Sequence, residues 1–167
     1  MTRRNTLQIE RISLETTHPW EQVVAGLERG IGRPEMAALQ KEMSRTISYA
    51  QYENVIQNAV GPAGLMEFLR LDLGEVLRRD STIKHPYRML RIIAGNPLIM
   101  KEMARHLPET GSYAPVTILV YEQGGSVHLR YDTMESLLAP YGNSAASAVA
   151  KALDAKVIRL MTAAIAS

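Results

Sequence analysis

Hydrophobic residues recur along this chain at two spacings, and each spacing predicts one kind of element. Alternation at every second position is typical of strands, and it marks residues 7–14, 65–73, 87–94 and 116–131. Spacing of three and four residues is typical of amphipathic helices, and it fills most of the chain between and after these segments. Because the last strand segment contains two strands, the sequence predicts an α+β protein whose mostly antiparallel sheet has about five strands.

The most regular strand pattern is the hairpin at residues 116–131. A run rich in β-branched residues leads to Gly124–Gly125, a pair that suits a tight hairpin turn. The second strand then alternates between an apolar and a polar face, which are Val127, Leu129 and Tyr131 on one side and Ser126, His128 and Arg130 on the other. We expect the first of these faces to enter the core.

The predicted helices begin at residues that favour helix starts. They follow Pro19, fill residues 33–60, follow Pro97 and start again at Asn143. The last of them is roughly 30 Å long at about 1.5 Å per residue, enough to cross a small sheet. Asp72 and Asp132 each precede a short helical stretch, so we expect them to cap it.

The motif Gly95–Asn96–Pro97 joins a predicted strand to a predicted helix. Asparagine is favoured at the N-cap and proline at the first helical position, so a strand–helix junction explains the motif without a ligand. A helix N-terminus is also a natural anion site, so a binding role stays open if a pocket forms there. The glycine spacing of a Walker or dinucleotide-binding loop is absent.

Composition and charge narrow the function classes. Charges of both signs are interleaved, so the net charge of +2 and the pI near 9.0 do not indicate a nucleic-acid partner. The absence of cysteine excludes disulfides, thiolate metal sites and cysteine nucleophiles. No apolar run approaches the roughly 20 residues that span a bilayer, and no secretory signal is visible. The sequence therefore predicts a cytoplasmic protein without a membrane partner.

Several short motifs in the second half of the chain resemble the domain of unknown function 302 family. They are Pro86–Tyr87, Asn96–Pro97, Pro115, the hairpin 116–131 and Asp132, with a further likeness at residues 69–80. The resemblance implies a compact α+β fold in which helices back a curved antiparallel sheet, often as a dimer. It implies no activity, because none is established for the family.

Two departures from the family pattern affect what the chain can do. Many members carry cysteine just before the Asn–Pro pair and just after the leading proline of the hairpin, where this chain has Gly95 and Val116. Thiol or metal chemistry suspected for such members cannot operate here. The block 33–60 resembles an insertion into a single domain spanning residues 1–167, and it either covers a pocket or builds a homodimer contact.

Methionine is abundant, with nine residues against one Phe and one Trp. Methionine fills irregular cores and adaptable binding surfaces alike, so two interpretations stay open: an ordinary core, or a pliable apolar cavity between sheet and long helix. The second suits a small hydrophobic ligand, up to the size of a haem. The residues that we expect to contact such a ligand are Tyr87, Asn96, Met100, Tyr121 and His128.

The enzyme alternative rests on His128, since imidazole titrates near neutrality and Arg130 or Arg91 accompanies it on a polar strand face. The four histidines are scattered, and none has metal-ligand spacing, so we predict no metal site, no cofactor and no assigned catalytic residue. The favoured function is a homodimeric binding protein for a small hydrophobic ligand. A protein-interaction module using residues 33–60 is the third possibility.

Overall fold

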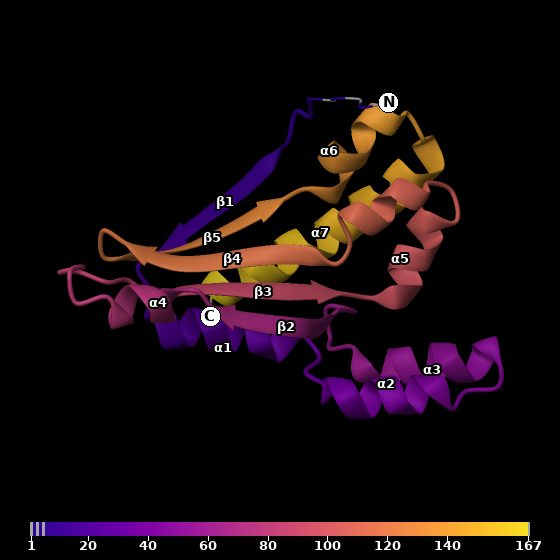
Figure 1. The fold of residues 1–167 in the computed structure, drawn as a ribbon, viewed down its shortest axis with the longest axis horizontal. Helices are drawn as coiled ribbons and strands as arrows, with labels where there is room; N and C mark the ends of the chain where they lie inside the picture. Colours follow the sequence, from indigo (N-terminus) through magenta and orange to yellow (C-terminus); the bar gives the residue numbers. More distant parts are fainter. Residues whose placement is uncertain (1, 3, 5, 167) are drawn as a thin grey trace.

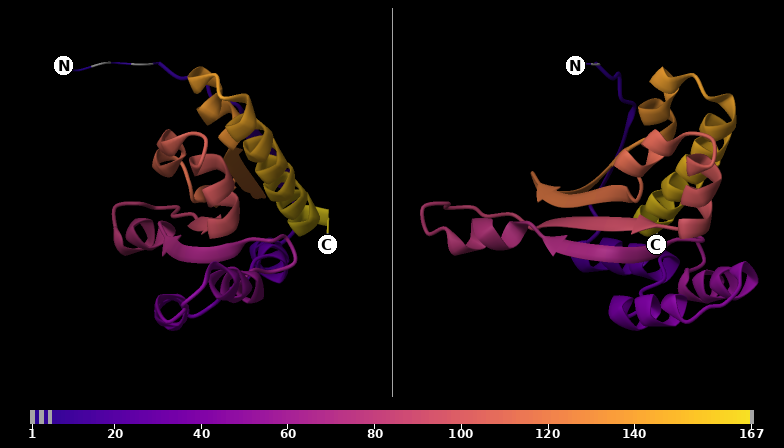
Figure 2. Two further views of the ribbon diagram at one scale, coloured as in Figure 1. Left: turned by 90° about the vertical axis from the view of Figure 1, so that its right-hand side faces the viewer. Right: turned by 45° about the vertical axis from the view of Figure 1, so that its right-hand side comes forward.

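Five antiparallel strands form a single sheet in the order β1-β5-β4-β3-β2. The computed structural model of the protein describes residues 2, 4 and 6–166. The strands are β1 (Arg11–Thr16), β2 (Met66–Asp72), β3 (Met89–Gly95), β4 (Val116–Gln123) and β5 (Ser126–Asp132). The sheet is curved (Figures 1 and 2), which confirms the predicted fold class.

Helices pack on one face of this sheet and at its ends. They are α1 (Trp20–Gly30), α2 (Met36–Ser44), α3 (Tyr49–Ala59), α4 (Gly74–Arg79), α5 (Pro97–Ala104), α6 (Met134–Leu138) and α7 (Ser144–Ala166), with 3-10 turns η1 (Pro108–Ser112) and η2 (Ala139–Tyr141). The long helix α7 lies behind the sheet in Figure 1, and α1, α5 and α6 pack against it. In the described part of the chain, no helix crosses the opposite face, which we call the open face.

The main core lies between the sheet and α7. Alternate strand residues point into it because successive side chains of a strand alternate between faces, and these include Ile92, Ile118, Val120, Leu129 and Tyr131. The buried side of α7 combines three small residues, Ala146, Ala150 and Ala164, with Leu153, Val157, Leu160 and Met161. Of these alanines, Ala164 lies where α1 approaches α7 closely.

The contact between α1 and α7 requires a glycine at position 26. A Cβ added to Gly26 would lie 2.7 Å from the Cα of Ala164, a distance that real Cβ atoms do not reach. The helices can therefore cross at this point only because Gly26 has no side chain and Ala164 has a small one.

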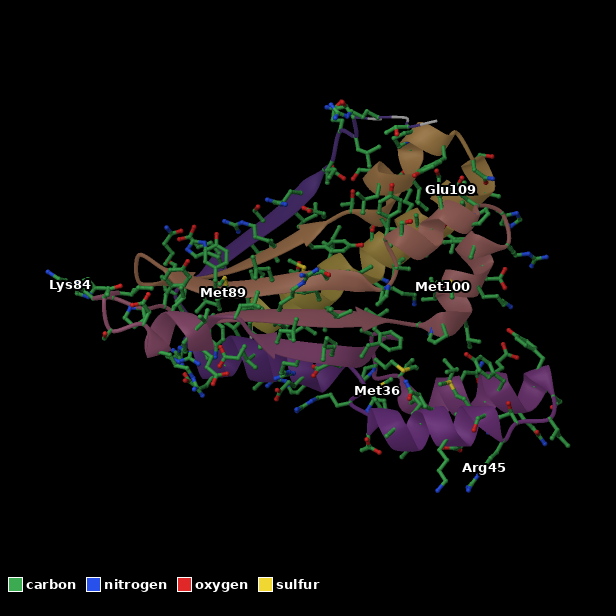
Figure 3. The ribbon with its side chains drawn as sticks, viewed as in Figure 1. Met36, Arg45, Lys84, Met89, Met100 and Glu109 are labelled. Carbon is green, nitrogen blue, oxygen red and sulfur yellow. The ribbon has the colours of Figure 1, made fainter. Side chains whose placement is uncertain are left out.

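Residues 33–60 form a helical hairpin with a small core of its own. Leu39, Val55 and Ile56 are buried with Met66 of β2, and Met36 packs against them (Figure 3). Ile47, which the helical spacing places on the same stripe, is 89% exposed because it lies in the turn between α2 and α3.

Two strands begin later than their alternation predicts. β1 starts at Arg11 rather than Leu7, since the preceding residue, Glu10, bonds to α6 instead: its N–H donates to Ser136 Oγ at 3.0 Å, and its carbonyl accepts from Thr133 N at 2.9 Å. β3 starts at Met89, so Tyr87 lies in the loop after α4.

The two aspartates expected to cap short helices both form ion pairs. Asp72 accepts from Arg78 at 2.5 Å, and Asp132 accepts from Arg11 at 2.6 Å. Asp72 also keeps its expected role, because its pKa is lowered first by Arg78 and then by hydrogen bonds from the backbone N–H groups of Glu75 and Gly74 at the start of α4. The N-terminus of α6 is capped from a distant helix by Asp154. No local sequence motif indicates this cap, because Asp154 lies 20 residues after Met134 and 19 after Glu135 in the chain.

Asp154 makes three hydrogen bonds although its side chain is almost fully buried. Its carboxylate accepts from the N–H groups of Met134 at 2.8 Å and Glu135 at 2.9 Å, and from the hydroxyl of Tyr131 at 2.5 Å. Burial, followed by the charge of Asp154, raises the pKa of Tyr131 well above its usual value. The hydroxyl therefore stays protonated as a donor, and one carboxylate joins β5, α6 and α7.

We expect Asp154→Ala to lower the free energy of unfolding by about 3 kcal/mol, because it leaves buried donors without an acceptor. Urea unfolding monitored by circular dichroism measures this. Asp132→Ala is the matched control: it removes an ion pair that is partly exposed on both sides, and we expect a loss below about 1 kcal/mol. Equal losses in the two variants would contradict the role assigned to Asp154.

Candidate functional site

An apolar pocket opens where β3 meets α5, at the motif Gly95–Asn96–Pro97. Its volume is about 360 Å³, within the range of small-molecule sites. We call it the Asn96 pocket, and its lining residues are Phe68, Gly95, Asn96, Pro97, Ile99, Met100, Met103, Ala114, Pro115, Val116 and Leu153. It therefore draws on three strands (β2, β3 and β4), on α5, on the loop before β4 and on α7.

Asn96 fixes the geometry of this pocket through both ends of its amide. Its Oδ1 accepts from the N–H of Leu98 at 2.9 Å, which makes it the N-cap of α5, and Pro97 occupies the first helical position. Its Nδ2 donates to the carbonyl of Gly64 at 2.9 Å. The interpretation of the motif as a strand–helix junction is confirmed. Both the oxygen and the nitrogen of the Asn96 amide make hydrogen bonds within the fold.

The pocket offers apolar contact and little polar chemistry. Met103 and Val116 are buried against the core, whereas Met100 is 38% exposed and lies at the surface of α5 (Figure 3). No charged side chain is among the lining residues. Such a site can hold an apolar molecule by exclusion of water and dispersion contact, but it contains no acid, base or nucleophile.

Gly95 leaves space for the side chains that form one wall. A Cβ added there would lie 3.2 Å from Phe68 Cε2 and 3.2 Å from Pro115 Cβ. Gly95 and Val116 are the positions at which many members of the resembled family carry cysteine, and both line this pocket. The sequence analysis used this departure only to exclude thiol and metal chemistry, and it did not place either residue in a pocket.

Of the lining residues, the sequence predicted only Asn96 and Met100 as ligand contacts, and three of those it missed come from distant parts of the chain. Phe68 lies on the edge strand, Pro115 follows the cis peptide bond after Ala114, and Leu153 lies on α7. Nothing in the local sequence links them, because they are brought together by the pairing of β2, β3 and β4 and by the packing of α7 on the sheet.

The five residues expected to contact a ligand lie in three places. Asn96 and Met100 line the pocket. Tyr121 and His128 stack on each other on the open face, with ring centroids 4.9 Å apart. Tyr87 is 44% exposed in the loop between α4 and β3.

His128 lies in a partly closed environment on the open face. Its Nε2 is 3.2 Å from the carbonyl of Gln123, and its Nδ1 is 3.8 Å from Glu15 Oε2, beyond hydrogen-bond distance. The Arg130 guanidinium lies over the ring of Tyr121 at 5.4 Å. His128 is not among the residues that line the Asn96 pocket. Arg130, two positions along the same face of β5, lines a separate cavity of about 520 Å³ on the open face.

The described residues 2, 4 and 6–166 contain no cluster of side chains suited to hold a metal ion. No group of three or more histidine, aspartate and glutamate side chains comes together there. Within the same residues, no helix combines the length and the apolar character needed to cross a bilayer.

Comparison with known proteins gives a family and a fold. Residues 39–164, well over half of the chain, match the family described as domain of unknown function DUF302. The match begins inside the block 33–60, so most of that block lies in the matched region. No curated protein matches.

A solved structure gives the same architecture. The chain is similar to the crystal structure of an uncharacterized conserved protein DUF302 from Bacillus stearothermophilus, with a TM-score of 0.63 and 11% sequence identity. The alignment covers 92% of this chain and 97% of that one. At this identity the likeness shows the fold alone.

We expect Asn96→Ala to lower the free energy of unfolding by about 2 kcal/mol, since it removes both the cap of α5 and the bond to Gly64. Asn96→Ser keeps a capping oxygen and loses only the Gly64 bond, so we expect a loss of about 1 kcal/mol. Guanidinium unfolding curves compare the two. If both variants lose the same amount, the cap contributes nothing at this junction.

Proposed function

Because this chain belongs to the DUF302 family, whose description names no activity, we propose a function from geometry: the protein binds a small hydrophobic molecule in the Asn96 pocket. The observation that carries the proposal is a cavity of about 360 Å³ without a charged lining residue. Two of the ligand residues expected from the sequence, Asn96 and Met100, line it.

The lining favours an uncharged ligand without a demanding hydrogen-bond pattern. A charged group entering this pocket would lose its hydration without gaining a partner. Met100 at the surface and Met103 at the base are flexible side chains that adapt to different shapes. We therefore propose selection by size and hydrophobicity.

Fluorescence titration with N-phenyl-1-naphthylamine tests this proposal, because the uncharged dye brightens when it leaves water. We expect saturable binding of one dye per chain. Ala114→Phe places a ring in the pocket, and we expect it to weaken dye binding at least about tenfold. Ala114 is only partly buried, so its free energy of unfolding should change by less than about 1.5 kcal/mol.

The matched control is Ala145→Phe, on the exposed first turn of α7 and away from the pocket. It adds the same ring to the surface and should leave dye affinity unchanged. Met100→Trp is a second blocking variant in case Ala114→Phe does not fold. Unaltered affinity in both blocking variants would refute binding in the Asn96 pocket.

The homodimer expected from the sequence stays a prediction, and we propose the open face as its contact surface. Leu69, which is 49% exposed, pairs with Ile93 in the ladder, and Leu119 pairs with Arg91. Charged side chains of both signs, Arg91, Arg130 and Glu15, lie on the same face, so a second copy related by a two-fold axis presents complementary groups. A different protein would need its own apolar surface and its own charges in matching positions to bind this face, whereas a second copy already has them.

We expect light scattering during gel filtration to give a dimer mass, and Leu69→Lys to shift it toward the monomer by placing a charge in the contact. Ile47→Lys, at the exposed turn between α2 and α3, is the control. A monomer only in Ile47→Lys would instead place the contact in the block 33–60. The cytoplasmic location likewise stays a prediction.

A further inference from the structure

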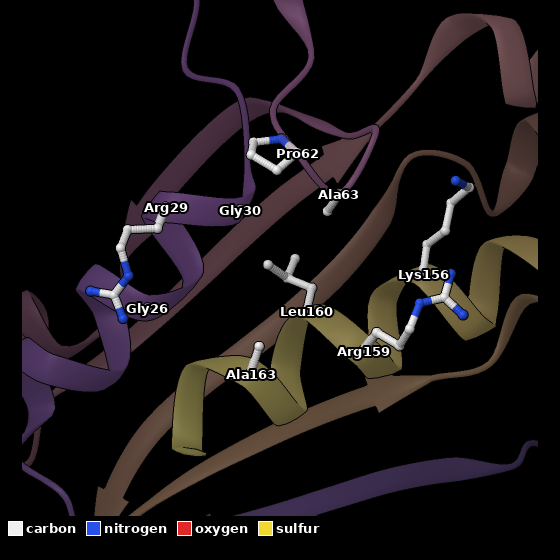
Figure 4. A pocket seen from close by; sticks show the side chains of 9 residues that line it. All are labelled: Gly26, Arg29, Gly30, Pro62, Ala63, Lys156, Arg159, Leu160 and Ala163. Carbon is white, nitrogen blue, oxygen red and sulfur yellow. The ribbon is translucent and has the colours of Figure 1, made fainter. Parts of the chain in front are cut away.

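A second cavity lies between α1, α7 and the loop at residues 61–64, away from the open face. Its volume is about 490 Å³. We call it the α1–α7 cleft, and Figure 4 shows its lining residues: Gly26, Arg29, Gly30, Pro62, Ala63, Lys156, Arg159, Leu160 and Ala163. Arg29 extends from α1 on one side of Leu160, and Lys156 and Arg159 extend from α7 on the other side.

The lining of this cleft contains three cations and no carboxylate. Most other arginines in the described chain have acidic partners; Arg70, for example, pairs with both Glu67 and Glu28. Within the described residues, neither Lys156 nor Arg159 has a carboxylate within ion-pair distance. Arg29 makes another contact in the chain, so the inference rests on the two α7 cations.

Helix stability does not explain this pair of cations. Lys156 and Arg159 are three residues apart on α7, where like charges face each other and destabilise a helix. The positions three and four residues from each of them hold no acidic side chain. The favourable effect of the helix dipole is confined to the last turn, and α7 continues to Ala166.

The loop opposite these cations forms one wall of the cleft, but the N–H groups of Ala63 and Gly64 already have partners within the protein. The N–H of Ala63 donates to the carbonyl of Gly30 at 2.9 Å, and the N–H of Gly64 donates to that of Gly61 at 2.8 Å. Pro62 has no N–H. A Cβ added to Gly64 would lie 3.6 Å from Lys156 Nζ, which places the ammonium beside the loop backbone.

The lower part of the cleft is apolar. Leu160 is buried and lies between the cations in Figure 4, facing Gly30 and Pro62. Ala63 and Ala163 add further apolar surface. An occupant therefore meets positive charge at the rim and hydrocarbon below it.

We propose that the α1–α7 cleft binds a small phosphate monoester whose substituent is apolar. The phosphate lies against Lys156 and Arg159, and the substituent contacts Leu160. A phosphate monoester carries nearly two negative charges near neutral pH and three acceptor oxygens, which match two adjacent cations better than a single carboxylate does. The planar guanidinium of Arg159 suits bidentate contact with phosphate oxygens.

Titration calorimetry and amide chemical shifts with n-hexyl phosphate test the proposal, with inorganic phosphate and n-hexanol as the two halves of the probe. We expect saturable binding of hexyl phosphate, weaker binding of inorganic phosphate and weakening of both by added NaCl. Hexanol should not shift the amides of the cleft. Lys156→Gln/Arg159→Gln should weaken hexyl phosphate binding at least about tenfold.

The matched control is Lys151→Gln, which removes an exposed cation from the same helix but outside the cleft, and it should leave affinity unchanged. Lys156→Arg keeps the charge and should retain affinity within about threefold. Absence of saturable binding, or equal affinity in the double variant, overturns the proposal. So does binding only to phosphatidylcholine vesicles that contain phosphatidic acid, because that result assigns the cations to a lipid headgroup.

Discussion

The buried carboxylate of Asp154 fixes how the long helix lies on the sheet. It accepts from the hydroxyl of Tyr131 on β5 and from the first N–H groups of α6. A buried charge is tolerated only where its hydrogen bonds are satisfied, so α7 cannot rotate or slide without leaving Asp154 unpaired. The same constraint holds Leu153 in the wall of the Asn96 pocket and orients Lys156 toward the α1–α7 cleft.

Local periodicity predicted the elements because each depends on a face that repeats within a few residues. The hairpin around Gly124–Gly125, the helix that starts at Pro97 and the long C-terminal helix all follow this pattern. Element ends were less predictable. β1 starts at Arg11 because Glu10 bonds to α6, a partner that the sequence around Glu10 does not reveal.

The candidate sites were predictable only in part, for a physical reason. The motif around Asn96 has a local meaning as an N-cap, and the sequence showed it. The pocket exists because Phe68, Pro115 and Leu153 meet there, and these contacts depend on tertiary packing across three distant segments. The role of Ala164 was missed for a related reason: helical periodicity is read from large apolar residues, whereas the close approach of α1 at Gly26 needs a small residue on α7.

The loop at residues 61–64 is the structural link between the two cavities. The carbonyl of Gly64 accepts from Asn96, which lines the pocket, while its Cα faces the ammonium of Lys156, which lines the cleft. Gly64 has a φ of +72°, a conformation that glycine adopts without the steric cost of a side chain. A side chain at this position would strain the backbone, although its Cβ would be only in ordinary contact with Lys156 Nζ at 3.6 Å. Glycine at position 64 therefore lets the loop take the backbone conformation in which it bonds to Asn96 on one side and lies beside Lys156 on the other.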